Sequence, residues 1–158
     1  TVCAQTVVLP ARRRGPTRRH FRKVIIMKGI GLLFFASGAI YGMGGMALGI
    51  WMGTAHDFTL APAHAHLNLL GFVTMSLMGV FYHVTPSAAH RFLARLHFGL
   101  ATLGVWLMVP GIALSVTGGN PGMAIVGSLL TAAAMLTFLV NLALTAFGPV
   151  RGARALPC

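Results

Sequence analysis

Two histidines, His64 and His66, stand at the start of an apolar stretch that runs to about residue 85. A neutral imidazole is a common ligand of metal ions and of haem iron. Ionisable side chains inside membrane-spanning segments are rare and energetically expensive, and those that occur there usually have a function. We therefore take His64 and His66 as the leading candidate ligands for a metal ion or a haem.

The spacing of the two histidines limits what they can do together. Residues two apart lie about 200° around an α-helix, so two helical rings would point to opposite faces and could not share one metal ion. They would then serve two separate sites, or one would pair with a ligand from elsewhere. A helix that began only after His66 would instead let both rings converge. A third possibility is that one or both rings cap the helix or hydrogen-bond to loop carbonyls.

Other side chains with suitable chemistry lie near this pair. His56 and Asp57, the only acidic residue, precede it in an expected loop. Asp57 could accept a proton from the far nitrogen of a ligating histidine, or lie in water without such a role. Asn68 is the second candidate for a residue that hydrogen-bonds to a ligating histidine. The thioether of Met52, combined with imidazole, would suit Cu(I), although most methionines in so apolar a chain are expected to fill the core.

A weaker candidate site involves histidines further along the chain. His83 ends the second apolar stretch and His97 opens the third, so antiparallel helices could bring the two rings together. The alternative is that both lie at the membrane interface and bond water, lipid or neighbouring carbonyls. Asn141, in the fourth apolar stretch, could form a hydrogen bond across helices.

The composition indicates which elements must position these residues. The chain has 158 residues and is 56% hydrophobic but only 8% charged, which is typical of an integral membrane protein and not of a soluble domain. Turn-forming prolines and glycines, including Pro62 and Pro86, separate four apolar stretches that are each long enough to cross a bilayer. These stretches lie at about 29–52, 64–85, 92–115 and 122–147. We expect an all-α membrane four-helix bundle.

The basic residues all fall on one side of this arrangement. The twelve lysines and arginines precede the first stretch, separate the second from the third, or follow the fourth, and segments 53–63 and 116–121 contain none. Because basic residues favour the cytoplasmic face, both termini are expected in the cytoplasm, with the paired histidines near the outer surface of a bacterial inner membrane. The net charge of +11 therefore indicates topology in a lipid bilayer and not nucleic-acid binding.

We expect the chain to have three parts. Residues 1–26 are Arg-rich and precede Met27-Lys28, which looks like an ordinary start of a membrane protein, so they are expected to be disordered or wrongly assigned. Residues 27–150 would form the four-helix domain, and 151–158 a cytoplasmic tail. Cys3 and Cys158 are both expected on the reducing cytoplasmic side, which argues against a disulfide framework. They fit no Cys-x-x-Cys or Cys-x-x-Cys-His pattern, which argues against a zinc site or covalently attached haem.

Glycines recur at four-residue intervals along the first apolar stretch. Faces of this kind let another helix approach closely. The first interpretation is packing inside the four-helix bundle, and the second is contact with a cofactor or with another copy of the chain. The glycines concerned are Gly38, Gly42, Gly45, Gly49 and Gly53.

The order of several motifs resembles the tenth and eleventh helices of haem–copper oxidase subunit I, the cytochrome oxidase family. There, a His-x-His opens a helix that ends in aromatic residues and a proline, and a basic loop leads to a helix beginning His-Phe-Trp-Leu. The matching segments here are His64-Ala65-His66, Phe81-Tyr82-His83-Val84-Thr85-Pro86 and Leu96-His97-Phe98-Gly99-Leu100. The resemblance covers about residues 60–115. Short four-helix bacterial proteins described as oxidase-subunit-I-like are similar over nearly the whole span from Met27.

This resemblance implies roles for individual residues. His64 would match the ligand of the high-spin haem and His66 that of the low-spin haem, whereas His97 would match a histidine that is not a haem ligand. The chain has no counterpart of the copper-binding histidine trio or of the second low-spin ligand, and Gly99 stands where the family has tryptophan. Alone, it would not be a complete oxygen-reducing enzyme. Self-association of four-helix chains could supply the missing ligands.

Three hypotheses follow. The first is a protein that binds haem b through His64, His66 or both, for electron transfer, redox sensing or support of a respiratory complex. The second is a copper-binding or oxidase-assembly module that uses His56 together with the pair and with methionine side chains near the outer surface, such as Met52. The third is a structural or interaction protein without a cofactor. A single acidic residue nearly excludes hydrolytic acid–base and Mg²⁺-dependent chemistry, and independent catalysis is not expected.

Overall fold

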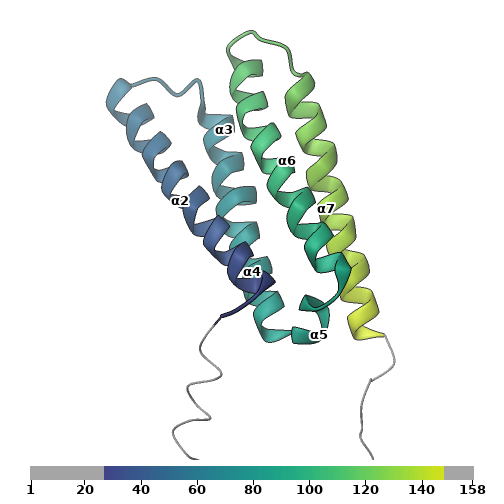
Figure 1. Ribbon diagram of the computed structural model, residues 1–158. Coiled ribbons are helices and arrows are strands. Elements are labelled where there is room, and N and C mark those ends of the chain that lie inside the picture. The colour runs from purple at the N-terminus through teal and green to yellow at the C-terminus, as the bar shows by residue number, and fades with distance from the viewer. Residues whose placement is uncertain (1–26, 148–158) are drawn as a thin grey trace, which may run out of the picture.

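The computed structural model describes residues 27–147 as a set of helices (Figure 1). The segments expected to be an extension at 1–26 and a tail at 151–158, with Cys3 and Cys158, lie outside the described residues. Four helical spans are long and apolar enough to cross a membrane, and no strand occurs in the described part of the chain. The spans are α2 (Ile30–Ala55), a composite helix over Ala61–Val84, α6 (Phe92–Val116) and α7 (Gly122–Ala146). The expected all-α membrane four-helix fold is confirmed.

The second span starts earlier than its apolar pattern indicates. Pro62 lies inside the first turn of α3 (Ala61–His66) and not in the preceding loop. Proline is well tolerated there, because its missing N–H is one of the donors that a helix start leaves without a partner. His64 and His66 are therefore both helical, and the possibility that the helix begins only after His66 is wrong.

A π-helical segment interrupts the same span. It is η1 (Leu67–Thr74), and the span then continues as α4 (Met75–Val84), followed by the short α5 (Pro86–Ala89). In η1 the hydroxyl of Thr74 donates to the carbonyl of Leu69 five residues earlier, at 2.8 Å. Gly71 lies beneath Tyr41, where a Cβ atom would come within 2.9 Å of the tyrosine Cβ. The π segment rotates the side chains that follow it relative to the paired histidines.

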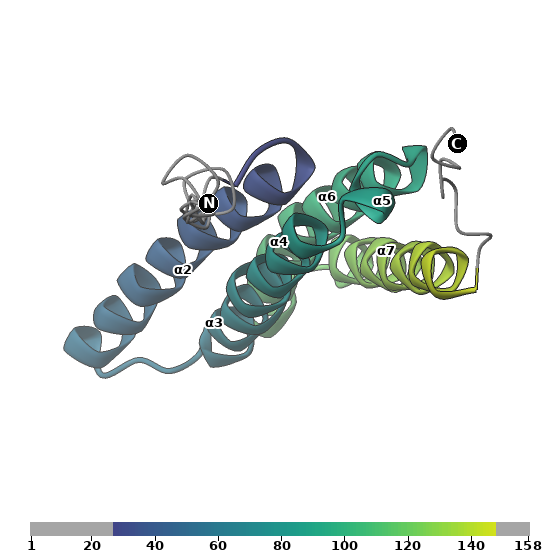
Figure 2. The same ribbon diagram turned by 90° about the horizontal axis from the view of Figure 1, so that it is seen from below.

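The four spans form two antiparallel hairpins. α2 packs along η1 and α4, and α6 packs along α7, while α3 and η1 connect the hairpins by contacting α6. Viewed along the helices, α2 and α7 lie at opposite edges and the composite helix and α6 lie between them (Figure 2). Both ends of the described chain lie at the same end of the molecule, close to α5 (Figure 1).

The glycine face of α2 packs inside the chain. A Cβ atom on Gly38, Gly42, Gly45 or Gly49 would come within 3 Å of a side-chain atom on the neighbouring composite helix, and Gly53 alone of the five has nothing within 4 Å. The expected internal packing is thus confirmed for four positions, and the expected contact between copies stays a prediction. The side chains that cover the four glycines are Ser76, Phe72, Asn68 and His64, respectively.

A second set of glycines brings α6 against α7. A Cβ atom on Gly111 would overlap the backbone of Ala124, and one on Gly127 would overlap the backbone of Met108. Neither glycine stood out in the sequence, because they lie on different helices and form no four-residue series. Close backbone contact of this kind supplies much of the packing between helices in lipid, where the hydrophobic effect adds little.

We predict that Gly111→Ala destabilises the protein, because the added methyl meets backbone atoms that cannot rotate away. The expected loss in the free energy of unfolding is about 1–3 kcal/mol, measured as denaturation of the purified protein in detergent. Gly99→Ala on the same helix is the control, since nothing lies within 4 Å of its Cβ position. The control should be neutral or slightly stabilising. Equal effects of the two substitutions would contradict the close packing of α6 and α7.

Candidate functional site

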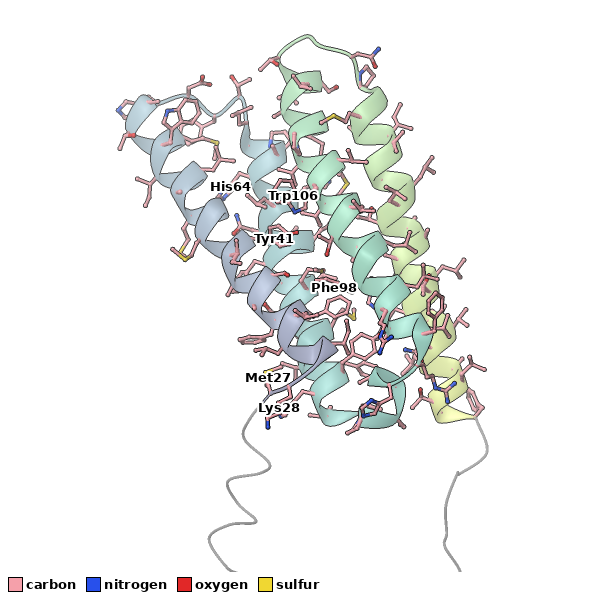
Figure 3. The ribbon with its side chains drawn as sticks, in the orientation of Figure 1. Met27, Lys28, Tyr41, His64, Phe98 and Trp106 are labelled. Carbon is pink, nitrogen blue, oxygen red and sulfur yellow. The ribbon has the colours of Figure 1, made fainter. Side chains whose placement is uncertain are left out.

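His64 lies in the interface between α3 and α2 (Figure 3). A Cβ atom on Gly49 would lie only 2.9 Å from Cε1 of the His64 ring, so the glycine makes room for the imidazole. Nδ2 of Asn68 lies 3.3 Å from each ring nitrogen and also donates to the His64 carbonyl at 3.0 Å. Asn68 thus contacts the histidine that it was expected to support, and together the two contacts restrict how the His64 ring can turn.

His66 has a different arrangement. Its Nδ1 lies 2.8 Å from the carbonyl oxygen of Pro62, one helical turn earlier. Because a carbonyl oxygen can only accept, Nδ1 carries the proton, and in a neutral ring the lone pair is then on Nε2. Nε2 has no hydrogen-bond partner among residues 27–147. Metal-bound histidines commonly hold their other nitrogen in this way, with its N–H on a backbone carbonyl.

The two histidines do not converge on one metal ion. With His64 directed at α2 and both residues helical, His66 points about 200° away from that interface. Within residues 27–147 the structure gathers no group of three histidine, cysteine, aspartate or glutamate side chains that could hold a metal ion. Each ring of the pair is therefore a separate candidate ligand.

The loop before the pair is organised by Asp57. Its carboxylate accepts a hydrogen bond from the Thr59 N–H at 2.9 Å. Hydrogen bonds from the Thr59 hydroxyl and N–H hold the pKa of Asp57 below its usual value, so the carboxylate stays ionised at neutral pH. His56 is exposed with a left-handed backbone (φ 53°), which ends α2, while Met52 is buried. The hydrogen bonds of Asp57 thus go to Thr59 and not to a histidine.

A buried polar network lies near the opposite end of the molecule. His97 is 2% exposed, and its Nδ1 lies 3.1 Å from the hydroxyl of Tyr82. Asn141 donates through Nδ2 to that hydroxyl at 3.3 Å and to the carbonyl of Ala88 at 3.2 Å. The expected bond of Asn141 across helices is confirmed.

The orientation of the Asn141 amide is fixed by its partners. The Ala88 carbonyl can only accept, so the amide nitrogen faces both Ala88 and the Tyr82 hydroxyl. The Tyr82 hydroxyl accepts from Asn141 and shares a second hydrogen bond with Nδ1 of His97. Oδ1 of Asn141 is buried and has no partner among the described residues.

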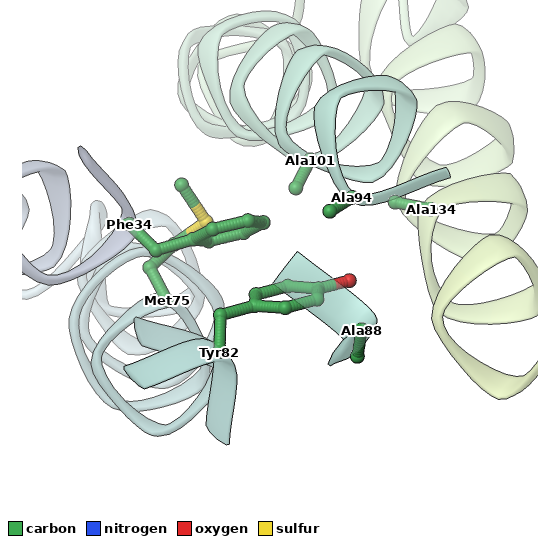
Figure 4. Close-up of a cluster of buried hydrophobic side chains, with 7 residues drawn as sticks. All are labelled: Phe34, Met75, Tyr82, Ala88, Ala94, Ala101 and Ala134. Atoms are coloured by element: carbon green, nitrogen blue, oxygen red, sulfur yellow. The ribbon is translucent and has the colours of Figure 1, made fainter. Parts of the chain in front are cut away.

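Aromatic rings enclose His97. The rings of Phe34 and Phe138 have centroids 4.8 and 5.4 Å from that of the imidazole. Small residues from three helices lie around the rings of Phe34 and Tyr82 (Figure 4). A pocket of about 30 Å³, large enough for one water molecule, lies beside His97. The small residues are Ala88, Ala94, Ala101 and Ala134.

His83 lies outside this network, although Tyr82 belongs to the network and also lines the pocket that contains His83. His83 lines an open pocket at the end of α4, whereas His97 is buried in the network. The structure thus places the two histidines of the weaker candidate site in different surroundings. Sequence reasoning missed the Tyr82–His97 contact, because Tyr82 was one of several aromatic residues suited to a core or to the membrane interface.

The fold and these sites define a multi-pass integral membrane protein with histidines at both ends of its second span. Comparison of the chain with family models, curated proteins and solved structures gave no match.

We predict that Asn141→Leu lowers the free energy of unfolding by about 1–3 kcal/mol, because the Ala88 carbonyl loses its side-chain donor in a buried place. Leucine has the same number and branching of side-chain heavy atoms as asparagine, so the substitution leaves no cavity. Thr137→Ala on the same helix is the control, since the Thr137 hydroxyl bonds only to the Ala133 carbonyl of its own helix. The free energy of unfolding of both variants is measured by denaturation in detergent. Equal values for the two variants would contradict a structural role for the network.

Proposed function

We propose that this protein binds haem b with His66 as an axial ligand, and that it acts in electron transfer, redox sensing or the support of a respiratory complex. The observation that carries the proposal is the 2.8 Å contact between Nδ1 of His66 and the Pro62 carbonyl. This contact directs the lone pair of a neutral ring to Nε2, which is the state that iron ligation requires.

The surroundings of His66 suit such a ligand. It lies five residues beyond the start of α3, about 8 Å along the helix axis, and so belongs to the apolar second span and not to the preceding loop. Leu69, three residues further and so on the same side of the helix, is 62% exposed and offers an apolar surface to a flat ligand. Haem would supply one-electron chemistry when bound, and the chain would supply an axial ligand and exclude water.

The described residues would offer the haem iron one imidazole ligand, that of His66. His64 is packed on Gly49 and contacts Asn68, so its ring is less free to ligate than that of His66. A second ligand to the same iron would come from another copy of the chain or from a partner. The resemblance to haem–copper oxidase subunit I implies such an arrangement if four-helix chains associate with one another. The proposal is thus a ligand-donating subunit and not a complete oxygen reductase.

Copper is the less favoured cofactor. His56, His64 and His66 do not form a group of three ligands among residues 27–147. A copper site would need thioethers or ligands from a second chain, whereas an axial haem ligand needs only one oriented imidazole.

We also propose that the end carrying α5 faces the cytoplasm of a bacterium, with the paired histidines near the outer surface. Lys28, Arg91 and Arg95 lie at the α5 end, and the described residues have their one carboxylate, Asp57, in the opposite loop. An excess of basic residues on the cytoplasmic side is the usual determinant of orientation.

This orientation predicts the accessibility of single cysteines. In a version with Cys3→Ser and Cys158→Ser, an impermeant maleimide should label Thr117→Cys in intact spheroplasts. Ser87→Cys, in α5, should react only after the membrane is permeabilised. Both positions are exposed in the structure, so burial would not explain a difference between them. The reverse pattern would contradict the orientation.

The haem proposal predicts the visible spectrum of the detergent-purified protein, oxidised and reduced with dithionite. We expect a Soret band and a reduced α-band that are lost in His66→Ala, because the variant lacks the imidazole that would bind iron. His90→Ala, which removes an exposed histidine at the other end, is the control and should keep both bands. A protein that stays colourless when expressed with added haem, or bands that persist in His66→Ala, would overturn the proposal. Copper retained through desalting by a colourless protein would favour copper instead.

A further inference from the structure

A second candidate site lies at the α5 end, far from the paired histidines. An open pocket of about 800 Å³ lies among the start of α2, the end of α4, α5 and the first turns of α6. Figure 3 labels Lys28 and Phe98, two of its lining residues. This volume falls within the range of pockets that hold small-molecule ligands.

Four nitrogen-bearing side chains line this pocket, namely Lys28, His83, His90 and Arg95. Lysine and arginine are permanent cations, and an imidazole donates hydrogen bonds in either protonation state. Within residues 27–147 the one carboxylate is that of Asp57, in the loop beyond the other end of the spans. The positive charge of the pocket therefore has no carboxylate partner in the described part of the chain.

Apolar side chains form most of the remaining lining, which also includes Tyr82. Ile30, Leu33 and Phe98 come from the ends of two membrane spans, and Pro86 and Ala89 come from α5. The pocket thus joins a cationic part to an apolar part at the level where membrane helices end. A ligand complementary to both parts has a negatively charged head and an apolar tail.

We propose that this pocket binds the phosphate group of an anionic phospholipid from the adjacent leaflet. Lys28 and Arg95 would pair with the phosphate, His83 and His90 would donate hydrogen bonds, and the first acyl carbons would lie against Leu33 and Phe98. Basic pockets at the cytoplasmic ends of membrane helices suit such headgroups. Free inorganic phosphate shares the charged group but would leave the apolar wall uncovered. This inference does not depend on haem binding.

Arg91 provides a matched control for the charge. It stands four residues before Arg95, but its guanidinium donates to the Leu144 carbonyl at the end of α7, at 3.0 Å. It does not line the pocket. Arg95→Gln and Arg91→Gln therefore remove the same charge from the same end of the protein, one inside the pocket and one outside it.

The test is native mass spectrometry of the full chain in detergent, titrated with phosphatidylglycerol or with phosphatidylcholine. The wild-type protein should retain phosphatidylglycerol preferentially. Arg95→Gln should weaken this binding about fivefold, and Lys28→Gln by a similar factor, because each basic residue near an anionic surface contributes to this extent. Arg91→Gln should retain binding close to that of the wild type. Lys28 precedes α2, so its variant serves as the second test if Arg95→Gln does not fold.

Several outcomes would overturn the proposal. The first is equal retention of the two lipids by the wild-type protein. The second is an equal loss of phosphatidylglycerol binding in Arg95→Gln and Arg91→Gln. The third is that millimolar inorganic phosphate displaces phosphatidylglycerol and also binds to the lipid-free protein, which would identify a soluble anion as the ligand. Retention of phosphatidylglycerol in the presence of phosphate, with loss in the two pocket variants, would support the lipid.

Discussion

The close approach of α2 to the composite second span is the contact on which the candidate histidine site depends. Lipid surrounds both helices, so burying apolar side chains between them contributes little, and the pair is stabilised mainly by van der Waals packing at small residues. Gly45 and Gly49 leave the space that Asn68 and His64 occupy. A larger residue at either glycine would move the composite helix away, and the amide and the imidazole would then face lipid with only each other and their own helix as partners. The glycines thus set the position of one histidine directly, and that of His66 through the shared helix.

The same need for internal partners explains the polar side chains elsewhere in the spans. An unpaired polar group in hydrocarbon costs several kcal/mol by order of magnitude, so such groups bond to their own helix or to one another. The hydroxyls of Thr131 and Thr137 donate hydrogen bonds to the carbonyls four residues earlier in the same helix. Asn141, Tyr82 and His97 lack that option and instead form one connected network between helices. The network therefore joins the two hairpins at their α5 end, whereas the glycine contacts of α2 lie within the first hairpin.

The four helical spans could be predicted because their length and apolar composition leave no other stable form in a bilayer. The position of His66 opposite His64 could be predicted as well, since it follows from helical geometry once both residues are helical. The early start at Ala61 could not, because Pro62 suits a loop and a first helical turn equally well. No residue type indicates a π-helix, so η1 could not be predicted from the sequence. The Tyr82–His97 contact depends on how two separate spans rotate against each other, which one sequence does not specify.

Distance along the second span separates the two proposed sites. His66 and His83 are 17 residues apart on a nearly continuous helix, which corresponds to about 25 Å, close to the thickness of the hydrocarbon core. A ligand on His66 and an anionic headgroup at His83 would therefore occupy opposite leaflets and share no side chain. Charge follows the same division, with the sole described carboxylate beyond one end and the pocket cations at the other. Because the two sites have different chemistry and no common residue, the loss of either one leaves the physical basis of the other intact.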